Sequence, residues 1–134
     1  MGRTVTMNAA DVRGRARTAR EFHQVALERV EMAVPGPSEV AQVAAANAVQ
    51  AAIAASDALC GRAHGRHAAG DDHREAVRLL RAVPDSGDRL SKRLQRLLAS
   101  KTEFTYGGFC TLESASRATR DSAAFIEELD RLNL

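Results

Sequence analysis

Apolar residues recur every three or four positions along most of the chain, which is the spacing of one face of an α-helix. Together with caps and breakers, this pattern predicts five helices and no strand of convincing length. The first helix is expected over residues 9–33, with Asn8 as its N-cap, and Pro35-Gly36-Pro37 ends it. Its stripe consists of Val12, Ala16, Ala19, His23, Ala26, Val30 and Ala33.

The second helix, expected over residues 39–64 with Ser38 as its cap, is apolar on two sides instead of one. One side carries Val40, Ala44, Ala51, Ala55 and Leu59. Val49 and Ile53 lie on the other side, among polar residues. A helix that is apolar on two sides is buried on both. We therefore expect this alanine-rich helix to be the central one.

Three further helices are expected in the second half of the chain. The third begins at Asp71 or Asp72, has capping-box spacing to Glu75, and ends at Pro84. The fourth follows a cap at Asp85 or Ser86 and carries Leu90, Leu94, Leu97, Lys101 and Phe104, before Gly107-Gly108 breaks it. The fifth begins after Thr111 and runs nearly to residue 134, with a seam of Ala115, Ala118, Ser122, Phe125, Leu129 and Leu132. Short linkers make successive helices antiparallel neighbours.

The fold class predicted is all-α, a four- to five-helix up-and-down antiparallel bundle in a single domain over residues 1–134, with residues 1–8 as a flexible N-terminus. Composition agrees, since 45% of the 134 residues are apolar but only 4% are aromatic, which favours closely packed helices. No signal-peptide pattern or membrane-length apolar run is present. We expect a cytoplasmic protein with no membrane contact, in which Cys60 and Cys110 are reduced thiols.

Polar residues at positions where the helical pattern calls for apolar ones are the candidates for function. Burying a polar group costs free energy unless it is paired. His23 is expected to be a satisfied core histidine. We expect Asp57, His73, Lys101 and Tyr106 to line a ligand-binding cleft between the second, third and fourth helices. The alternative is structural: a carboxylate paired with arginine, a histidine at the bundle end, and a lysine near a helix C-terminus.

Arginines form two bands that could neutralise phosphate. The first band is Arg13, Arg15, Arg17 and Arg20, and the second is Arg62, Arg66, Arg74, Arg78 and Arg81. Arg74 and Arg78 are candidate ligand contacts, although a solvated face balanced by nearby acidic residues is the alternative. The net charge of +2 does not demand nucleic acid. The four histidines lack metal-site spacing, and no phosphate-binding glycine loop is present, so we expect no metal and no cofactor.

The segment IAASDALCGRAHGRHAAGDDHREAVRLL (residues 53–80), the segment KTEFTY (residues 101–106) and the last helix together resemble the HEPN superfamily of small prokaryotic helical domains. The resemblance covers residues 40–131 and rests on pattern more than on a rigid motif. It implies a four- or five-helix bundle that is usually dimeric. Many members are metal-independent ribonucleases of toxin, phage-defence or RNA-processing systems. Others are non-catalytic partners of small nucleotidyltransferases, or nucleotide- and RNA-binding modules.

The chain departs from the family's ribonuclease motif, which is Arg, four to six residues, then His, near the start of the last core helix. Lys101 stands in place of that Arg, and no His flanks Tyr106. Arg62 to His67 and Arg66 to His73 have the right spacing, but in the linker between the second and third helices. A general acid or base is therefore missing from the family's position.

These features predict a non-enzymatic HEPN-like binding domain for a nucleotide, RNA or partner protein, in a toxin–antitoxin or defence-type system. The expected partners are a second copy in a homodimer, a nucleotidyltransferase or antitoxin, and RNA or a nucleotide. One alternative is a divergent ribonuclease that uses Arg66 and His73, or Lys101 and Tyr106 with a His from the dimer mate. The other is a purely structural helical interaction protein.

Overall fold

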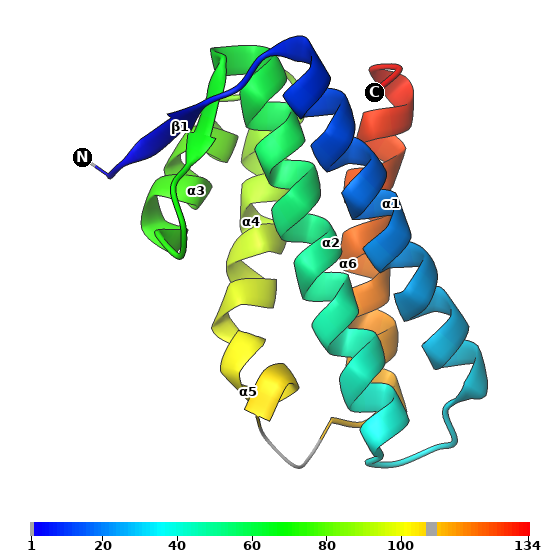
Figure 1. The fold of residues 1–134 in the computed structure, drawn as a ribbon. Helices are drawn as coiled ribbons and strands as arrows, with labels where there is room; N and C mark the ends of the chain where they lie inside the picture. Colours follow the sequence, from blue (N-terminus) through cyan, green and yellow to red (C-terminus); the bar gives the residue numbers. More distant parts are fainter. Residues whose placement is uncertain (1, 107–109) are drawn as a thin grey trace.

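A computed structural model of the chain describes residues 2–106 and 110–134, with side chains described for 2–104 and 110–134. Among these residues the elements are, in chain order, β1 (Thr4–Thr6), α1 (Ala9–Met32), α2 (Glu39–His64), β2 (Arg66–Ala68), α3 (His73–Arg81), α4 (Gly87–Ala99), α5 (Lys101–Tyr106) and α6 (Leu112–Arg131). The prediction of an all-α bundle is confirmed, since helices make up most of the described chain (Figure 1).

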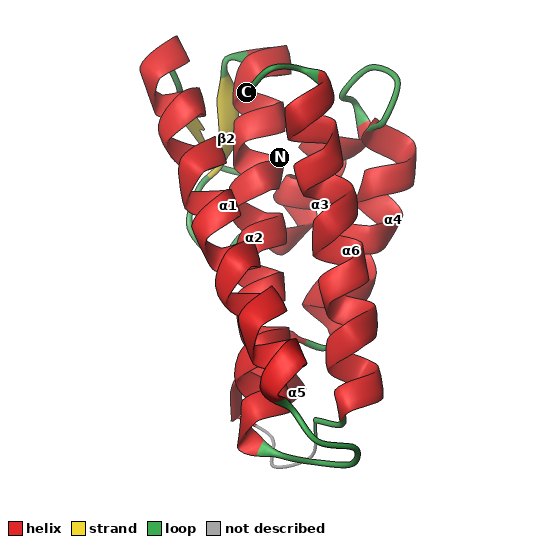
Figure 2. Cartoon of the chain, turned by 90° about the vertical axis from the view of Figure 1, so that its right-hand side faces the viewer, coloured by secondary structure: helices red, strands yellow, loops and turns green. Residues whose placement is uncertain are grey.

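Four long helices, α1, α2, α4 and α6, form an up-and-down bundle. The chain descends in α1, rises in α2, descends in α4 and rises in α6 (Figure 1). The view from the side shows α1 and α2 paired closely, with α6 running alongside (Figure 2). Helix α2 contacts every other helix as well as β2, as its two apolar sides predict.

Alanine builds the centre of this bundle. Helix α2 buries nine alanines completely: Ala41, Ala44, Ala45, Ala48, Ala51, Ala52, Ala54, Ala55 and Ala58. Their small side chains let α1 and α6 approach closely, and larger residues such as Leu59, Leu80 and Phe125 fill the remaining space. By length and composition α2 could cross a membrane, but 67% of its most apolar window is buried inside the bundle, as in the core helix of a soluble protein.

The N-caps lie where the sequence placed them. Asn8 forms a reciprocal capping box with Asp11, in which the Asp11 N–H donates to Asn8 Oδ1 at 2.8 Å and the Asn8 N–H donates to Asp11 Oδ2 at 2.9 Å. Ser38, Asp72 and Thr111 each accept a backbone N–H one turn into α2, α3 and α6.

Two details of capping differ from expectation. Glu75 does not complete a capping box with Asp72; its carboxylate instead accepts the Gly2 N–H at 2.6 Å and an N–H of Arg78. Ser86 is the N-cap residue of α4, but its side chain makes no capping hydrogen bond. The expected break at Gly107-Gly108 lies outside the described residues.

The expectation of one uninterrupted fourth helix to Phe104 is wrong. Helix α4 ends at Ala99, and α5 begins at Lys101 after a turn at Ser100. The Ser100 N–H donates to the Leu97 carbonyl at 3.2 Å, which tightens the last turn of α4. This change of direction lets Phe104 become buried at 7% exposure, with α5 against α2.

No strand of convincing length was expected, and the two strands present are only three residues long; β1 lies within residues 2–8, which were expected to be flexible. β1 and β2 pair antiparallel, with Thr4 opposite Ala68 and Thr6 opposite Arg66. Three-residue strands are too short to show alternation in a sequence. Met7 then packs against Gly61 of α2, where a Cβ would lie 2.5 Å from the Met7 sulfur. The two-stranded ribbon formed by β1 and β2 packs over the end of α2, which brings β2 beside Asp57.

Candidate functional site

A pocket of about 440 Å³ lies beside α2, between that helix, β2, the start of α3 and the α4–α5 turn. Its apolar lining comes from Ile53, Ala68, Ala76, Leu94 and Leu98. Its titratable lining comes from Arg15, Asp57, His67, Asp71, His73 and Lys101. The volume is in the range of small-molecule sites, and an apolar floor with a few converging polar groups is their usual composition.

Asp57 is the most buried of the ion-paired residues that line the pocket, since only 14% of its side chain is exposed. It lies on the sixth turn of α2, where antiparallel α1 passes alongside and β2 folds over. Arg15 of α1 donates to Asp57 Oδ2 at 2.9 Å. The other carboxylate oxygen, Oδ1, lies 3.5 Å from Nδ1 of His67.

Burial raises the pKa of the Asp57 carboxyl above its ordinary value of 3.8. Electrostatic interactions of Asp57 with His67 and Arg15, and the hydrogen bond from Arg15, lower the pKa of Asp57 without overcoming the effect of burial. The environment therefore disfavours the charged form of Asp57. A carboxyl so perturbed in a cleft beside charged partners is a candidate functional group.

His67 is held in a defined tautomer by the ribbon that carries it. Its Nδ1 lies 2.7 Å from the carbonyl oxygen of Ala68. A carbonyl oxygen can only accept, so Nδ1 carries a proton and Nε2 is the atom that can exchange one. Sequence reasoning named His67 only for its spacing from Arg62 and left it in a linker, because the pairing of β1 with β2 that places it beside Asp57 was not foreseen.

His73 and Lys101 enter the pocket from the first residues of α3 and α5. Lys101 is 28% exposed, and its Nζ lies 3.9 Å from an oxygen of Asp71, whose side chain is 93% exposed. Such a solvated, long pair contributes little to stability. It leaves the Lys101 ammonium available to a ligand.

The expected cleft thus brings together Asp57, His73 and Lys101 from three separate elements. Arg74 and Arg78 do not line it; they border a neighbouring groove between α3 and α4. Arg66 is exposed on β2 and is not among the pocket residues, so the pairing of Arg66 with His73 is not assembled there. The side chain of Tyr106 lies outside the described residues.

His23 has the satisfied position expected of a core histidine. Its Nδ1 lies 2.8 Å from the Ser122 hydroxyl oxygen, and that hydroxyl donates to the Thr119 carbonyl at 2.9 Å. The Ser122 oxygen therefore accepts from the His23 Nδ1–H, which joins α1 to α6. Burial lowers the pKa of His23.

Neither cysteine is placed for nucleophilic chemistry. Cys60 and Cys110 are both buried and free. Burial raises the pKa of the Cys60 thiol to about 12 and also raises that of Cys110. A thiol held protonated is a poor nucleophile and metal ligand. Within residues 2–106 and 110–134, no three His, Cys, Asp or Glu side chains gather closely enough to hold a metal ion.

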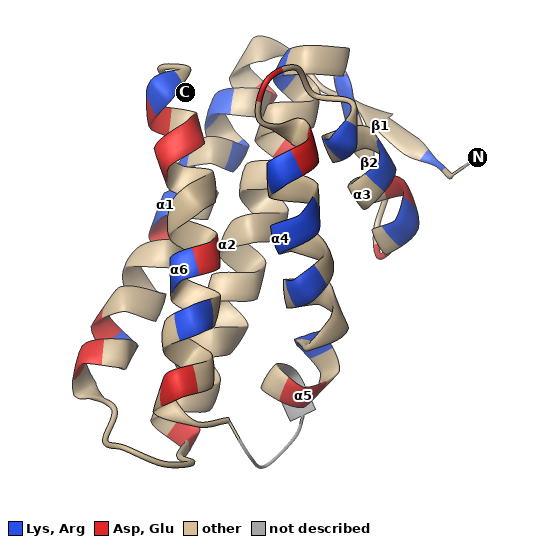
Figure 3. Cartoon of the chain, turned by 180° about the vertical axis from the view of Figure 1, so that it is seen from behind, with Lys and Arg blue, Asp and Glu red and all other residues tan. Residues whose placement is uncertain are grey.

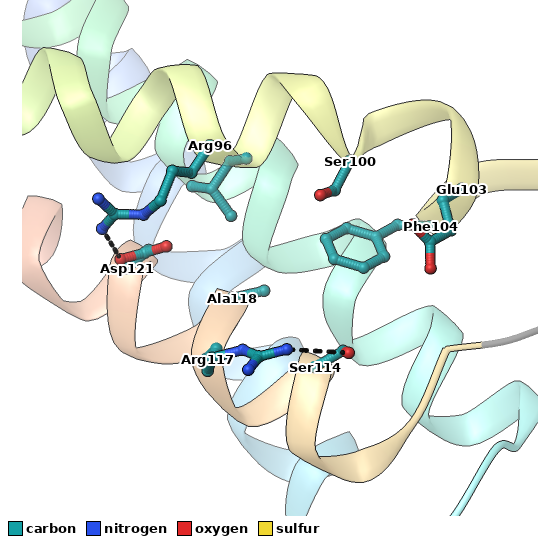
Figure 4. A pocket seen from close by; sticks show the side chains of 9 residues that line it. Arg96, Ser100, Glu103, Phe104, Ser114, Arg117, Ala118 and Asp121 are labelled. Carbon is teal, nitrogen blue, oxygen red and sulfur yellow. Dashed lines mark hydrogen bonds and ion pairs between the residues drawn. The ribbon is translucent and has the colours of Figure 1, made fainter.

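A second pocket, of about 350 Å³, lies on the other side of α4, against α5 and α6 (Figure 4). Arg96 bonds Asp121 at 3.0 Å across it, and Arg93 bonds the same Asp121 oxygen at 2.7 Å. Arg117 reaches the Ser114 hydroxyl at 3.4 Å. Sequence reasoning missed this cluster, because Arg93 and Arg96 of α4 lie 28 and 25 positions from Asp121 of α6. The three- and four-residue spacing of arginines along α4 was the available signal. Its main charges are already paired across the helices, which indicates a structural tie.

No protein-family model matches this chain, and a comparison with curated proteins finds no significantly similar sequence.

Proposed function

We propose that the protein is a HEPN-like, non-enzymatic binding domain whose Asp57 pocket takes a nucleotide, either free or as one unit of an RNA strand. The observation that carries this proposal is the convergence of Lys101, His73 and Arg15 around an apolar floor within about 440 Å³. A nucleotide presents a flat, largely apolar base and a phosphate, and the pocket lining includes both apolar and cationic side chains.

The cations supply the phosphate side of the proposed contact. Lys101 is held only loosely by Asp71, so its ammonium can turn to a phosphate oxygen without breaking a strong bond. His73 lines the pocket at the N-terminal end of α3, where the helix dipole also favours an anion. Ile53, Leu94 and Leu98 supply the apolar side for the base.

Calorimetric titration with AMP, ATP and a short single-stranded RNA tests this proposal. Lys101→Ala and His73→Ala should each weaken binding by about tenfold, since each removes one charge-assisted contact of roughly 1.4 kcal/mol. The matched control is Lys92→Ala. Lys92 is an exposed lysine of α4 that pairs with Asp88 at 3.3 Å and does not line the pocket, so its removal should leave affinity unchanged. Absence of binding at millimolar ligand and low salt would refute the proposal.

A divergent metal-independent ribonuclease is the second candidate, favoured by one observation. His67 lies beside Asp57, and the Ala68 carbonyl accepts its Nδ1–H, so Nε2 could act as a general base while Lys101 neutralises phosphate. Incubation of a fluorescent RNA with chelator present separates the two candidates. Cleavage abolished by His67→Ala would establish the nuclease, and binding without cleavage would establish the non-enzymatic domain. Membership of a toxin–antitoxin or defence-type system is part of the proposal that rests on the family resemblance alone.

A further inference from the structure

One oxygen of the Asp57 carboxylate is open to a ligand. In the α4–α6 cluster, where basic and acidic residues lie side by side (Figure 3), Asp121 accepts hydrogen bonds from two arginines. Asp57 accepts only one, from Arg15 to Oδ2 at 2.9 Å. Its Oδ1 accepts no hydrogen bond from any residue that the structure describes, because Nδ1 of His67, 3.5 Å away, donates to the Ala68 carbonyl instead. The Asp57 carboxylate therefore brings an unused acceptor to the pocket that it lines.

Asp57 and Arg15 together present three hydrogen-bonding positions in a fixed order. Oδ1 of Asp57 is an acceptor, and Oδ2 is a second one, since each carboxylate oxygen has two acceptor sites and Arg15 occupies one of those on Oδ2. The guanidinium of Arg15 lies next to Oδ2, lines the same pocket and has further N–H groups to donate. The order is therefore acceptor, acceptor, donor.

Guanine is the base whose pairing edge complements this order, because it presents the donors N2–H and N1–H followed by the acceptor O6. Adenine and cytosine each have a ring nitrogen lone pair beside their amino group, and uracil has a carbonyl on each side of its single N–H. Each would set an acceptor against a carboxylate oxygen, which is repulsive. Gln50 also lines the pocket, but its amide carries both a donor and an acceptor and does not discriminate between bases. A guanidinium ligand has paired N–H donors too, but it would share the pocket with the positive charges of Arg15 and Lys101.

We propose that the pocket selects a guanine nucleotide, and that Asp57 and Arg15 are the residues that determine this specificity. The inference rests on the proposed function of the pocket as a nucleotide site. Ile53 precedes Asp57 by one turn of α2, so it lies on the same helical face and can pack against the base. Burial raises the pKa of the Asp57 carboxyl, and two N–H donors from a ligand would stabilise its charged form. Phosphate contacts are common to all nucleotides, so the selectivity comes from the base edge.

Calorimetric titration of the wild type with GMP, IMP and AMP tests base selection, since the three ligands share the same ribose and phosphate. GMP should bind at least about tenfold more tightly than AMP, because AMP leaves the carboxylate facing a lone pair. IMP keeps N1–H and O6 but lacks the 2-amino group, so its affinity should fall between the two. Equal affinities for GMP and AMP, or tighter binding of AMP, would overturn the guanine inference and leave the nucleotide pocket standing. Absence of binding by all three would overturn both.

Asp57→Asn supplies the decisive arm. Its amide oxygen can keep the bond from Arg15, which puts the amide NH₂ in the place of Oδ1, opposite the 2-amino group of guanine. XMP has a carbonyl at that position instead, so the variant should bind XMP at least about tenfold more tightly than GMP, the reverse of the wild type. Binding of XMP also shows that the variant is folded.

Asp71→Asn is the matched control for this substitution. Asp71 lines the same pocket, but its side chain is 93% exposed, so the variant should keep the wild-type preference for GMP over AMP. An Asp57→Asn protein that still prefers GMP to XMP, or an equal loss of base preference in both variants, would overturn the assignment of specificity to Asp57.

Discussion

Asp57 and Glu128 are both largely buried acidic side chains that pair with an arginine. Their pKa values nevertheless shift in opposite directions. Glu128, with 3% of its side chain exposed, accepts two N–H groups of Arg131 at 2.6 and 2.8 Å. These bonds lower the pKa of its carboxyl. Asp57 accepts a single bond from Arg15, with His67 further away at 3.5 Å, and burial raises its pKa.

The charge of Glu128 stabilises the fold, and the charge of Asp57 does not. A forked arginine compensates Glu128 for the loss of water, so its charge stabilises the folded state. Asp57 is incompletely compensated, and its charge at neutral pH opposes folding. A residue that weakens the fold and lines a pocket is a better candidate for function than one that strengthens it.

The largest expected effect comes from breaking the Glu128 pair. Glu128→Gln should lower the free energy of unfolding by about 1.5 kcal/mol at pH 7, because a charge-assisted pair becomes a single neutral hydrogen bond. The adjacent Glu127 is exposed, so Glu127→Gln is the matched control and should change little. Urea unfolding followed by circular dichroism measures both. Equal effects of the two substitutions would show that the fork contributes nothing.

The pH dependence of the Glu128 effect has a definite sign. The folded pKa lies below the ordinary 4.5, so the stabilisation is present above pH 4.5 and is lost as the pH falls through the folded value. Wild type and Glu128→Gln should therefore converge in stability at acidic pH. A difference that stays constant between pH 7 and pH 3 would contradict this.

His23 extends the comparison to a half-buried side chain whose neutral form is favoured. Its folded pKa is lowered from 6.5 by burial, so its contribution to stability is present above pH 6.5 and is lost as the pH falls below that value. His23→Gln should remove this part of the pH dependence, which is smaller than the Glu128 effect because His23 is partly exposed. Thermal unfolding between pH 5 and 8 measures it, and identical profiles for the two proteins would rule it out.

Asp57 should give the smallest change in stability. Asp57→Asn keeps an oxygen to accept the Arg15 N–H while removing a charge that burial disfavours, so the free energy of unfolding at pH 7 should stay within about 0.5 kcal/mol of the wild type or rise. The folded pKa lies above 3.8, so the wild type loses stability relative to the variant as the pH rises through the folded value. A loss of more than about 1.5 kcal/mol would place Asp57 with Glu128 as a stabilising pair.

Much of the fold could be predicted from local signals. Asn8, Ser38 and Thr111 cap helices through hydrogen bonds that span three residues, so the sequence alone contains the whole interaction. The end of α2 is likewise local, since Gly65 adopts a left-handed conformation with φ of 74°. The break at Ser100 was missed because its cause, the burial of Phe104 against α2, is a tertiary contact.

The site could be predicted only in part, for the same reason. Asp57, His73 and Lys101 were selected because each interrupts an apolar stripe, and the structure places all three on one pocket. Arg15 was grouped with a surface band and His67 with a linker. Arg15 lies 42 positions from Asp57 in the sequence and reaches it only because α1 packs against α2. His67 lies beside Asp57 only because β1 pairs with β2.

Nuclear magnetic resonance with a ¹⁵N-labelled protein tests whether the Asp57 pocket is the binding site. On titration with AMP, the amide shifts should change most at Asp57, His67, His73 and Lys101 and saturate together. Residues of the opposite pocket, such as Asp121 and Arg117, should not respond. Changes centred on that α4–α6 pocket, or no change at millimolar AMP, would contradict the account.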